Sequence, residues 1–146
     1  MKPLLYSFVL FLTATLSIYA SDWTTDYKAA LTQAKAQQKL VLLDFTGSDW
    51  CGFCQLLEKE VFTQPEFHHY ADQAFILVTV DYPHGTQLPD DLKQQNAALK
   101  QQFHPDGFPT LVVVDSDGKE LGRKVGYKPG SGPQAVIDEL KNISKS

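Results

Sequence analysis

Two cysteines, Cys51 and Cys54, lie three positions apart in this chain of 146 residues, and the chain has no others. Thiols at this spacing can close a disulfide and open it again, whereas structural disulfides normally join segments that are distant in sequence. The surrounding stretch is Ser48-Asp49-Trp50-Cys51-Gly52-Phe53-Cys54. Reversible thiol-disulfide chemistry is therefore the first interpretation of the pair.

Three other uses of a Cys-x-x-Cys pair compete with redox chemistry. Covalent haem attachment needs His directly after the second Cys, and Gln55 stands there instead. A zinc site could recruit His68 and His69, but adjacent residues on a helix point about 100° apart, which does not fit the usual ligand spacing. The interpretation as a passive pair of structural thiols is not excluded by the sequence. On balance the sequence favours redox chemistry without a metal.

The cysteines come between a predicted buried strand and a predicted amphipathic helix. The nearly continuous apolar run at 40–45 predicts a strand buried on both faces, and apolar residues four positions apart predict a helix over 51–62. Cys51 would then stand at a helix N-terminus, where unpaired N–H groups and the helix dipole stabilise a thiolate and lower its pKa below about 8.5. Cys54, one turn later, is expected to be more buried, with a higher pKa, and to close the disulfide.

The remaining elements must hold this strand and helix in place. Their order along the chain (helix, strand, helix, strand, helix, strand, strand, helix) predicts one α/β domain, a central mixed β-sheet flanked by helices on both faces. By periodicity and turn signals, we expect helices at 22–38, 90–103 and 134–143, a short helix opened by a capping box at 63–66, strands at 75–80 and 110–114, and a hairpin turn at 115–118 leading into 119–127.

Composition and charge exclude several classes of protein. The apolar fraction of 43% and the charged fraction of 21% match a folded globular chain rather than a disordered one. The 13 Lys and Arg against 17 Asp and Glu give a net charge of −4, so the chain lacks the basic surface that nucleic-acid binding requires. Two cysteines are too few for a disulfide-stapled scaffold.

The first twenty residues differ in kind from the rest of the chain. One positive charge precedes an apolar stretch at 4–16, and Ala20 offers a small residue at a cleavage point. This plan predicts a signal peptide at 1–20, followed by a mature domain at 21–146 that is exported. An uncleaved membrane anchor is the alternative, because the stretch is close to the lower length limit for a spanning helix. Ile18 also supports this alternative, since it is larger than the residue usually found two positions before the cut.

Four motifs follow one another in order along nearly all of 21–146. They are Val41-Leu42-Leu43-Asp44-Phe45, Trp50-Cys51-Gly52-Phe53-Cys54, Gly107-Phe108-Pro109-Thr110 and Lys124-Val125-Gly126. In this order and spacing they resemble the thioredoxin superfamily, and the sequence is most similar to exported bacterial thioredoxin-like proteins, of the type of the DsbD C-terminal domain and DsbH. The resemblance implies a thioredoxin-like fold, a periplasmic location, and no cofactor besides a redox-active Cys51–Cys54 disulfide.

The same resemblance assigns roles to residues around the cysteines. Pro109 would be a cis-proline facing the disulfide, and the backbone of Phe108 would pair with an extended substrate segment. Asp44, inside its apolar run, should be buried with a raised pKa, and would help to deprotonate Cys54 through water. Trp50 would shield the disulfide. The competing interpretations are an ordinary strand-start proline, a solvated carboxylate at a strand end and a core-filling tryptophan.

Departures from the family pattern bear on the kind of activity. The dipeptide Gly52-Phe53, expected to contact substrate, differs from that of thioredoxin at its second residue and resembles the Gly-Tyr of the isomerase DsbC. The loop 46–49 is about one residue longer than in thioredoxin, and Leu77 stands where thioredoxin has a Lys near its buried acid. The segment 84–104 is also longer, and is either a partner-binding insertion or an extended surface helix.

These observations lead to a functional expectation with two alternatives. We expect a monomeric thiol-disulfide oxidoreductase that reduces cysteine-containing exported proteins and receives electrons from a membrane protein. Gly52 and Phe53 add no charge or donor beside the thiolate, unlike the His of strongly oxidising DsbA, so the reducing direction is favoured. The alternatives are a disulfide isomerase, and a non-catalytic module that binds peptides beside Phe108 and Pro109.

Overall fold

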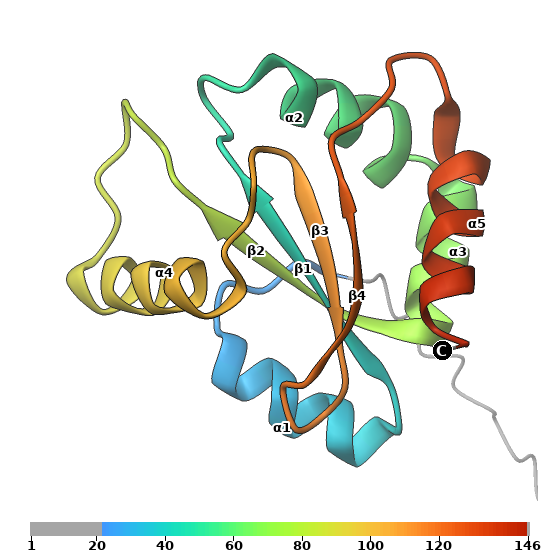
Figure 1. Cartoon of the computed structure of the whole chain (residues 1–146), viewed down its shortest axis with the longest axis horizontal. Helices are drawn as coiled ribbons and strands as arrows, with labels where there is room; N and C mark the ends of the chain where they lie inside the picture. The colour runs from blue at the N-terminus through green and yellow to red at the C-terminus, as the bar shows by residue number, and fades with distance from the viewer. Residues whose placement is uncertain (1–21, 146) are drawn as a thin grey trace, which may run out of the picture.

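A four-stranded mixed β-sheet forms the centre of the molecule, in the strand order β2-β1-β3-β4 (Figure 1). The structure is a computed structural model that describes residues 22–145, so the expected signal peptide at 1–20 lies outside the described residues. Strand β1 pairs in parallel with β2 and antiparallel with β3, and β3 pairs antiparallel with β4. The strands are β1 (Leu40–Thr46), β2 (Phe75–Asp81), β3 (Thr110–Val114) and β4 (Glu120–Val125).

Burial explains the composition of the strands. The two central strands, β1 and β3, are covered on both faces and are accordingly almost wholly apolar. The edge strand β4 is half-buried and carries charged residues, as exposed sheet edges commonly do. At the other edge, Thr24 forms an isolated parallel bridge to Val78 of β2. The site therefore rests on a sheet whose central strands are held on every side.

Helices cover both faces of the sheet, as the sequence predicted. On one face, α1 and α4 pack through residues such as Ala30 and Phe103, whereas α2, η1, α3 and α5 cover the other through residues such as Phe67 and Leu140 (Figure 1). Within 22–145, no helix is both long and apolar enough to span a membrane. The helices are α1 (Tyr27–Gln37), α2 (Gly52–Leu57), the π-helical turn η1 (Glu58–Phe62), α3 (Pro65–Ala74), α4 (Asp90–Phe103) and α5 (Gly132–Ile143).

Two of the predicted helix starts are wrong. The first helix begins at Tyr27 rather than at 22, because the Asp26 carboxylate caps it by accepting a hydrogen bond from the Ala29 N–H (2.9 Å). The capping box at 63–66 does not form. Gln64 is the N-cap of α3 and makes no side-chain cap bond, while the Thr63 hydroxyl donates backwards to the Lys59 carbonyl (2.9 Å). Thr63 ends the preceding π-helical turn instead of opening the next helix.

The long segment 84–104 consists of a loop followed by α4, whose bounds match the prediction. Leu99 and Phe103 pack on the sheet, and Asn96 beside them is 2% exposed. The Asn96 amide donates to the Asp81 carbonyl (2.9 Å), and the Tyr82 hydroxyl donates to the Asn96 carbonyl (2.6 Å). These bonds fix α4 against the carboxyl end of β2, next to the cysteines' own loop.

Candidate active site

Cys51 and Cys54 are joined in a disulfide at the start of α2. Cys51 is the N-cap residue, and its sulfur accepts a hydrogen bond from the Cys54 N–H at 3.3 Å. The predicted helix-terminal position of Cys51 is thus confirmed. In the closed disulfide the two side chains differ little in burial, with 7% of Cys51 and 5% of Cys54 exposed.

A tight turn after β1 delivers Cys51 to the helix N-terminus. The N–H of Cys51 donates to the Gly47 carbonyl at 2.9 Å, which brings the Trp50 indole over Gly47 so closely that any Cβ there would collide with the ring. The indole N–H donates to the Tyr82 carbonyl (2.7 Å), and 43% of Trp50 is exposed. Trp50 therefore covers the active-site loop at the surface, and the core-filling interpretation is wrong.

Acidic side chains tie this loop to the loop after β2. The two carboxylate oxygens of Asp49 accept hydrogen bonds from the backbone N–H groups of His84 (2.9 Å) and Gly85 (2.6 Å), which hold the pKa of Asp49 below its ordinary value. Similarly, Asp81 accepts from the backbone N–H and the hydroxyl of Ser48. The charge of Asp49 is thus engaged by main-chain donors.

Phe108 and Pro109 lie beside the same loop. The peptide bond between them is cis, as the resemblance implied. The Phe108 ring lies 5.8 Å from the Trp50 ring and stacks on Tyr82 at 5.3 Å. In the part of the chain that the structure describes, the backbone N–H and C=O groups of Phe108 have no hydrogen-bond partner. Main-chain donor and acceptor groups are therefore available next to Trp50.

The dipeptide between the cysteines lies at the surface. Gly52 is the first residue of α2, and a side chain in its place would meet open space. Phe53 is 54% exposed, which is high for a large apolar side chain. Gly52, Phe53, Trp50 and Phe108 thus form a mostly apolar rim around the disulfide.

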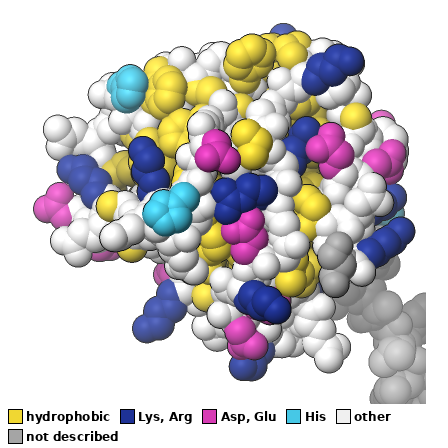
Figure 2. All heavy atoms as spheres, viewed as in Figure 1, with side chains coloured by type: hydrophobic (Ala, Val, Ile, Leu, Met, Phe, Trp, Pro, Cys, Tyr) yellow, Lys and Arg dark blue, Asp and Glu magenta, His cyan; other side chains and the backbone are white. Residues whose placement is uncertain are grey.

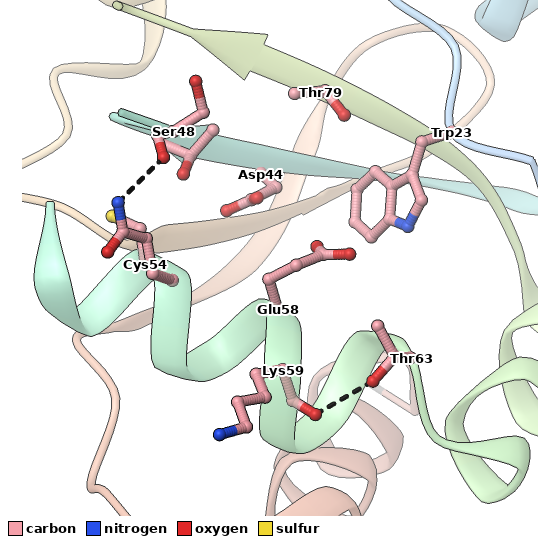
Figure 3. Close-up of a pocket in the computed structure, with 10 residues that line it drawn as sticks. Trp23, Asp44, Ser48, Cys54, Glu58, Lys59, Thr63 and Thr79 are labelled. Atoms are coloured by element: carbon pink, nitrogen blue, oxygen red, sulfur yellow. Dashed lines mark hydrogen bonds between the residues drawn. The ribbon is translucent and has the colours of Figure 1, made fainter. Parts of the chain in front are cut away.

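Asp44 lines a cavity of about 430 Å³ on the inner side of Cys54 (Figure 3). Only 7% of Asp44 is exposed, and its Oδ1 has no hydrogen-bond partner within 22–145. Burial, followed by the nearby charges of Glu58 and Asp81, raises the pKa of Asp44 to about 8. The predicted buried acid is confirmed, and the interpretation as a solvated carboxylate is wrong.

Two further cavity residues escaped the sequence analysis. Glu58 extends into the cavity beside Asp44 in Figure 3, and burial raises its pKa, against an opposing effect of His68. It stands four residues after Cys54, a spacing that puts two side chains on one helix face and could have pointed to it. Trp23 packs on Phe62 (4.7 Å between ring centroids), and its indole N–H lacks a partner within 22–145. No local pattern in the sequence marks Trp23.

The cross-strand neighbour of Asp44 on β2 is Thr79, while Leu77 pairs with Leu42 and is buried in the core. Strand β2 therefore brings no cation to Asp44. Lys59 also borders the cavity, but Figure 3 shows its side chain extending away from the two carboxylates. The acidic pair thus faces hydroxyl and aromatic groups.

The zinc interpretation gains no support from the geometry. The two cysteines are bonded to each other, and His69 contacts Gln73 (3.4 Å) on its own helix. Among residues 22–145, no group of three or more His, Cys, Asp or Glu side chains is arranged to hold a metal ion.

Comparisons with known proteins agree with this geometry. A family model described as a thioredoxin-like domain matches residues 27–141. Disulfide bond reductase DsbH of Chlamydia pneumoniae is 38% identical over 119 residues, covering 82% of this chain and 70% of that protein. A solved structure of DsbH oxidoreductase superposes with a TM-score of 0.80 at 34% identity, covering 96% of this chain and 95% of the other.

More distant relatives include the thiol:disulfide interchange protein DsbD of Cronobacter sakazakii, which is 33% identical over 104 residues. That match covers 70% of this chain but only 16% of DsbD. Together with the Cys51–Cys54 disulfide, these similarities identify the family and the type of activity. It belongs to the thioredoxin-like family and is a thiol-disulfide oxidoreductase of the DsbH and DsbD type.

Proposed function

We propose that this oxidoreductase works as a reductase of disulfides in exported proteins, in the periplasm. The observation that carries the proposal is the buried Asp44 carboxyl, which shares a cavity with Cys54 and has its pKa raised to about 8. The relative with 38% identity is named a disulfide bond reductase, which agrees with this direction.

In the first step, the reduced protein attacks its substrate through Cys51. The Cys51 thiolate, at the N-terminus of α2, bonds to one sulfur of the substrate disulfide, and the other substrate sulfur leaves as a thiolate. The product is a mixed disulfide between Cys51 and the substrate. The Cys54 N–H already donates to the sulfur of Cys51, and the same donor would stabilise the attacking thiolate.

In the second step, Cys54 releases the substrate. Cys54 loses its proton and attacks the sulfur of Cys51, which closes the protein disulfide and frees the second substrate thiolate. Two electrons have then passed from the protein dithiol to the substrate. An Asp44 pKa of about 8 lies close to the ordinary thiol value of about 8.5, so this carboxylate suits a base that takes the Cys54 proton directly or through water.

The surface around the disulfide suits an extended substrate segment. The unpaired backbone groups of Phe108 can form strand-like hydrogen bonds with such a segment, with Pro109 beside it. Trp50, Gly52 and Phe53 supply the exposed rim that the segment would cover. This arrangement supports the assignment of these five residues to substrate binding and positioning.

Reduction requires that electrons be returned to the Cys51–Cys54 disulfide. A membrane protein that delivers electrons to the exported side is the donor that we propose. Gly52 and Phe53 bring no charge to the cysteines, and the charge of Glu58, which helps to raise the pKa of Asp44, disfavours a further negative charge in this cavity. A poorly stabilised thiolate makes the reduced protein a better donor of electrons.

Two measurements test the proposal. The first is turnover of insulin disulfides, in which wild type should be active and Cys51→Ser inactive; equal rates would mean a non-catalytic peptide-binding module. The second is equilibration with glutathione, which should give a potential more negative than about −180 mV, the value of protein disulfide isomerase. A potential near the −120 mV of DsbA would refute the reducing direction.

A further inference from the structure

A second cavity lies on the outer side of Trp50, between the active-site loop and α4. It measures about 440 Å³, and its walls include Trp50, Tyr82, Leu88, Phe108 and the two lysines Lys93 and Lys100. Figure 2 shows hydrophobic side chains together with a histidine and Lys or Arg side chains on this upper left part of the surface, over the β2–α4 loop and α4.

We propose that this cavity binds an acidic side chain of the substrate segment, and that Lys100 selects for it. The inference rests on the proposed function, since it concerns the choice among disulfide substrates at the same site. The partner is a polypeptide with Asp or Glu a few residues from its disulfide-bonded cysteine.

The position of Lys100 carries the argument. Its ammonium group lies 5.2 Å from the Tyr82 ring centroid and 5.8 Å from that of Phe108. Within 22–145 it has no carboxylate partner. The Phe108 ring is in turn 5.8 Å from that of Trp50, the residue next to Cys51. A cation held over aromatic faces keeps its charge while losing some of its freedom, which prepares it for an anion.

Acidic side chains of the protein near this cavity are already engaged. Asp81 accepts two hydrogen bonds from Ser48, and Asp49 accepts two from backbone N–H groups. Lys93 forms an exposed ion pair with Asp90 at 3.5 Å, so its charge is partly balanced. Lys100 is therefore the cation of this cavity that remains available to a ligand.

The length of a substrate segment fits the path from the active site to Lys100. That path starts at Trp50, next to Cys51, and consists of two contacts of 5.8 Å each, from Trp50 to Phe108 and from Phe108 to Lys100. A strand advances about 3.3 Å per residue, so a side chain about two to four residues from the substrate cysteine can reach the ammonium group. The apolar rings would cover the aliphatic part of a Glu side chain while its carboxylate meets the ammonium group. The cavity thus combines apolar walls with the ammonium group of Lys100, which is unpaired within the described residues, while the Asp81 carboxylate that also lines it is hydrogen-bonded to Ser48.

The test uses short peptides whose single cysteine is activated as a neutral 2-thiopyridyl disulfide. In a matched series, Glu, Gln or Lys occupies one position, moved from two to four residues on either side of the cysteine. Stopped-flow release of thiopyridone from the reduced full-length protein gives the rate for each peptide. The Glu/Gln rate ratio within one variant removes any difference in overall reactivity.

For wild type, we expect the Glu peptide at the best position to react about two- to fivefold faster than the Gln peptide, as an exposed ion pair allows. This ratio should fall at high salt. Lys100→Gln should bring it to one, and Lys100→Glu should make the Lys peptide the faster. The matched control Lys28→Gln removes the same charge from an exposed site on α1 and should keep the wild-type ratio.

A wild-type ratio of one at every position, or a wild-type ratio that survives Lys100→Gln, would overturn the inference. A separate arm tests the proposed function itself, with hydroxyethyl disulfide as a small neutral substrate. If wild type reduces it no faster than Cys51→Ser does, the reductase proposal fails together with the inference. If wild type reduces it and the Glu/Gln rate ratio is one at every position, only the inference about Lys100 is wrong and the reductase proposal stands.

Discussion

Replacing the buried acid, Asp44→Asn, should stabilise the oxidised protein at neutral pH. The pKa of this carboxyl is about 8 in the fold against an ordinary value of 3.8, chiefly because burial disfavours its charged form. An asparagine has nearly the same shape and cannot ionise. Burying this carboxyl costs free energy of folding at every pH at which the unfolded chain would carry it as an anion, and the substitution removes that cost.

The pH dependence follows from the two pKa values. Below about pH 4 the carboxyl is protonated in both the folded and the unfolded chain, so the two proteins should be equally stable. As pH rises from about 4 to about 8, only the unfolded wild type releases its proton, and the stability of wild type falls relative to the variant. At pH 7 the pH lies about three units above the ordinary pKa of the carboxyl, and each unit corresponds to about 1.36 kcal/mol. The variant should therefore be more stable than wild type by about 4 kcal/mol at most.

The assay is urea unfolding of the oxidised proteins at intervals from pH 4 to 9, which keeps the thiols from titrating. The variant's advantage should grow from near zero at the acid end and level off above about pH 8. Asp117→Asn is the control, because the Asp117 side chain is 77% exposed, and its effect should stay within about 0.5 kcal/mol at all pH values. An advantage independent of pH, or a less stable variant at pH 7, would refute the assigned burial cost.

Three further substitutions and treatments test other parts of the site. Glu58→Gln should lower the pKa of Asp44, since the Glu58 charge helps to raise it. The loss of stability with rising pH should then level off at a lower pH in the variant than in wild type, and the same pH range in both proteins would contradict this. Alkylation of the reduced protein at pH 6, read by mass spectrometry, should label Cys51 before its partner. Gly47→Ala would put a Cβ in collision with the Trp50 indole, so thermal unfolding should show a loss of about 1–3 kcal/mol and the tryptophan emission should change.

Much of the fold could be predicted from local patterns. The apolar run at 40–45 and the polar helix at 90–103 depend on residues that are neighbours in sequence, and both match the structure within a residue. Asp44 could be predicted because a carboxyl inside an apolar strand has few alternatives to burial. The Cys51–Cys54 pair was visible for a similar reason, since both cysteines belong to one helical turn.

The parts that escaped prediction depend on contacts between distant segments. Trp23 reaches the cavity because Thr24 pairs with β2, more than fifty residues away, and nothing near Trp23 indicates this. Glu58 begins the π-helical turn after α2, and only the fold brings its side chain into one cavity with Asp44 of β1. The burial of Asn96 depends on its hydrogen bonds with Asp81 and Tyr82, which no helical periodicity reveals.

The bonds from Asp49 to the loop after β2 also bear on how this protein can diversify. Both donors are backbone N–H groups, at positions 84 and 85, which every amino acid except proline can supply. The side chain at position 84 is consequently free to change over evolutionary time without loosening the turn that carries the cysteines, whereas a Cβ at Gly85 would lie only 3.1 Å from the Asp49 carboxylate. His84, whose ring stacks on Trp50 at 4.6 Å, is the position where such drift would alter the surface offered to a substrate while the chemistry stays the same.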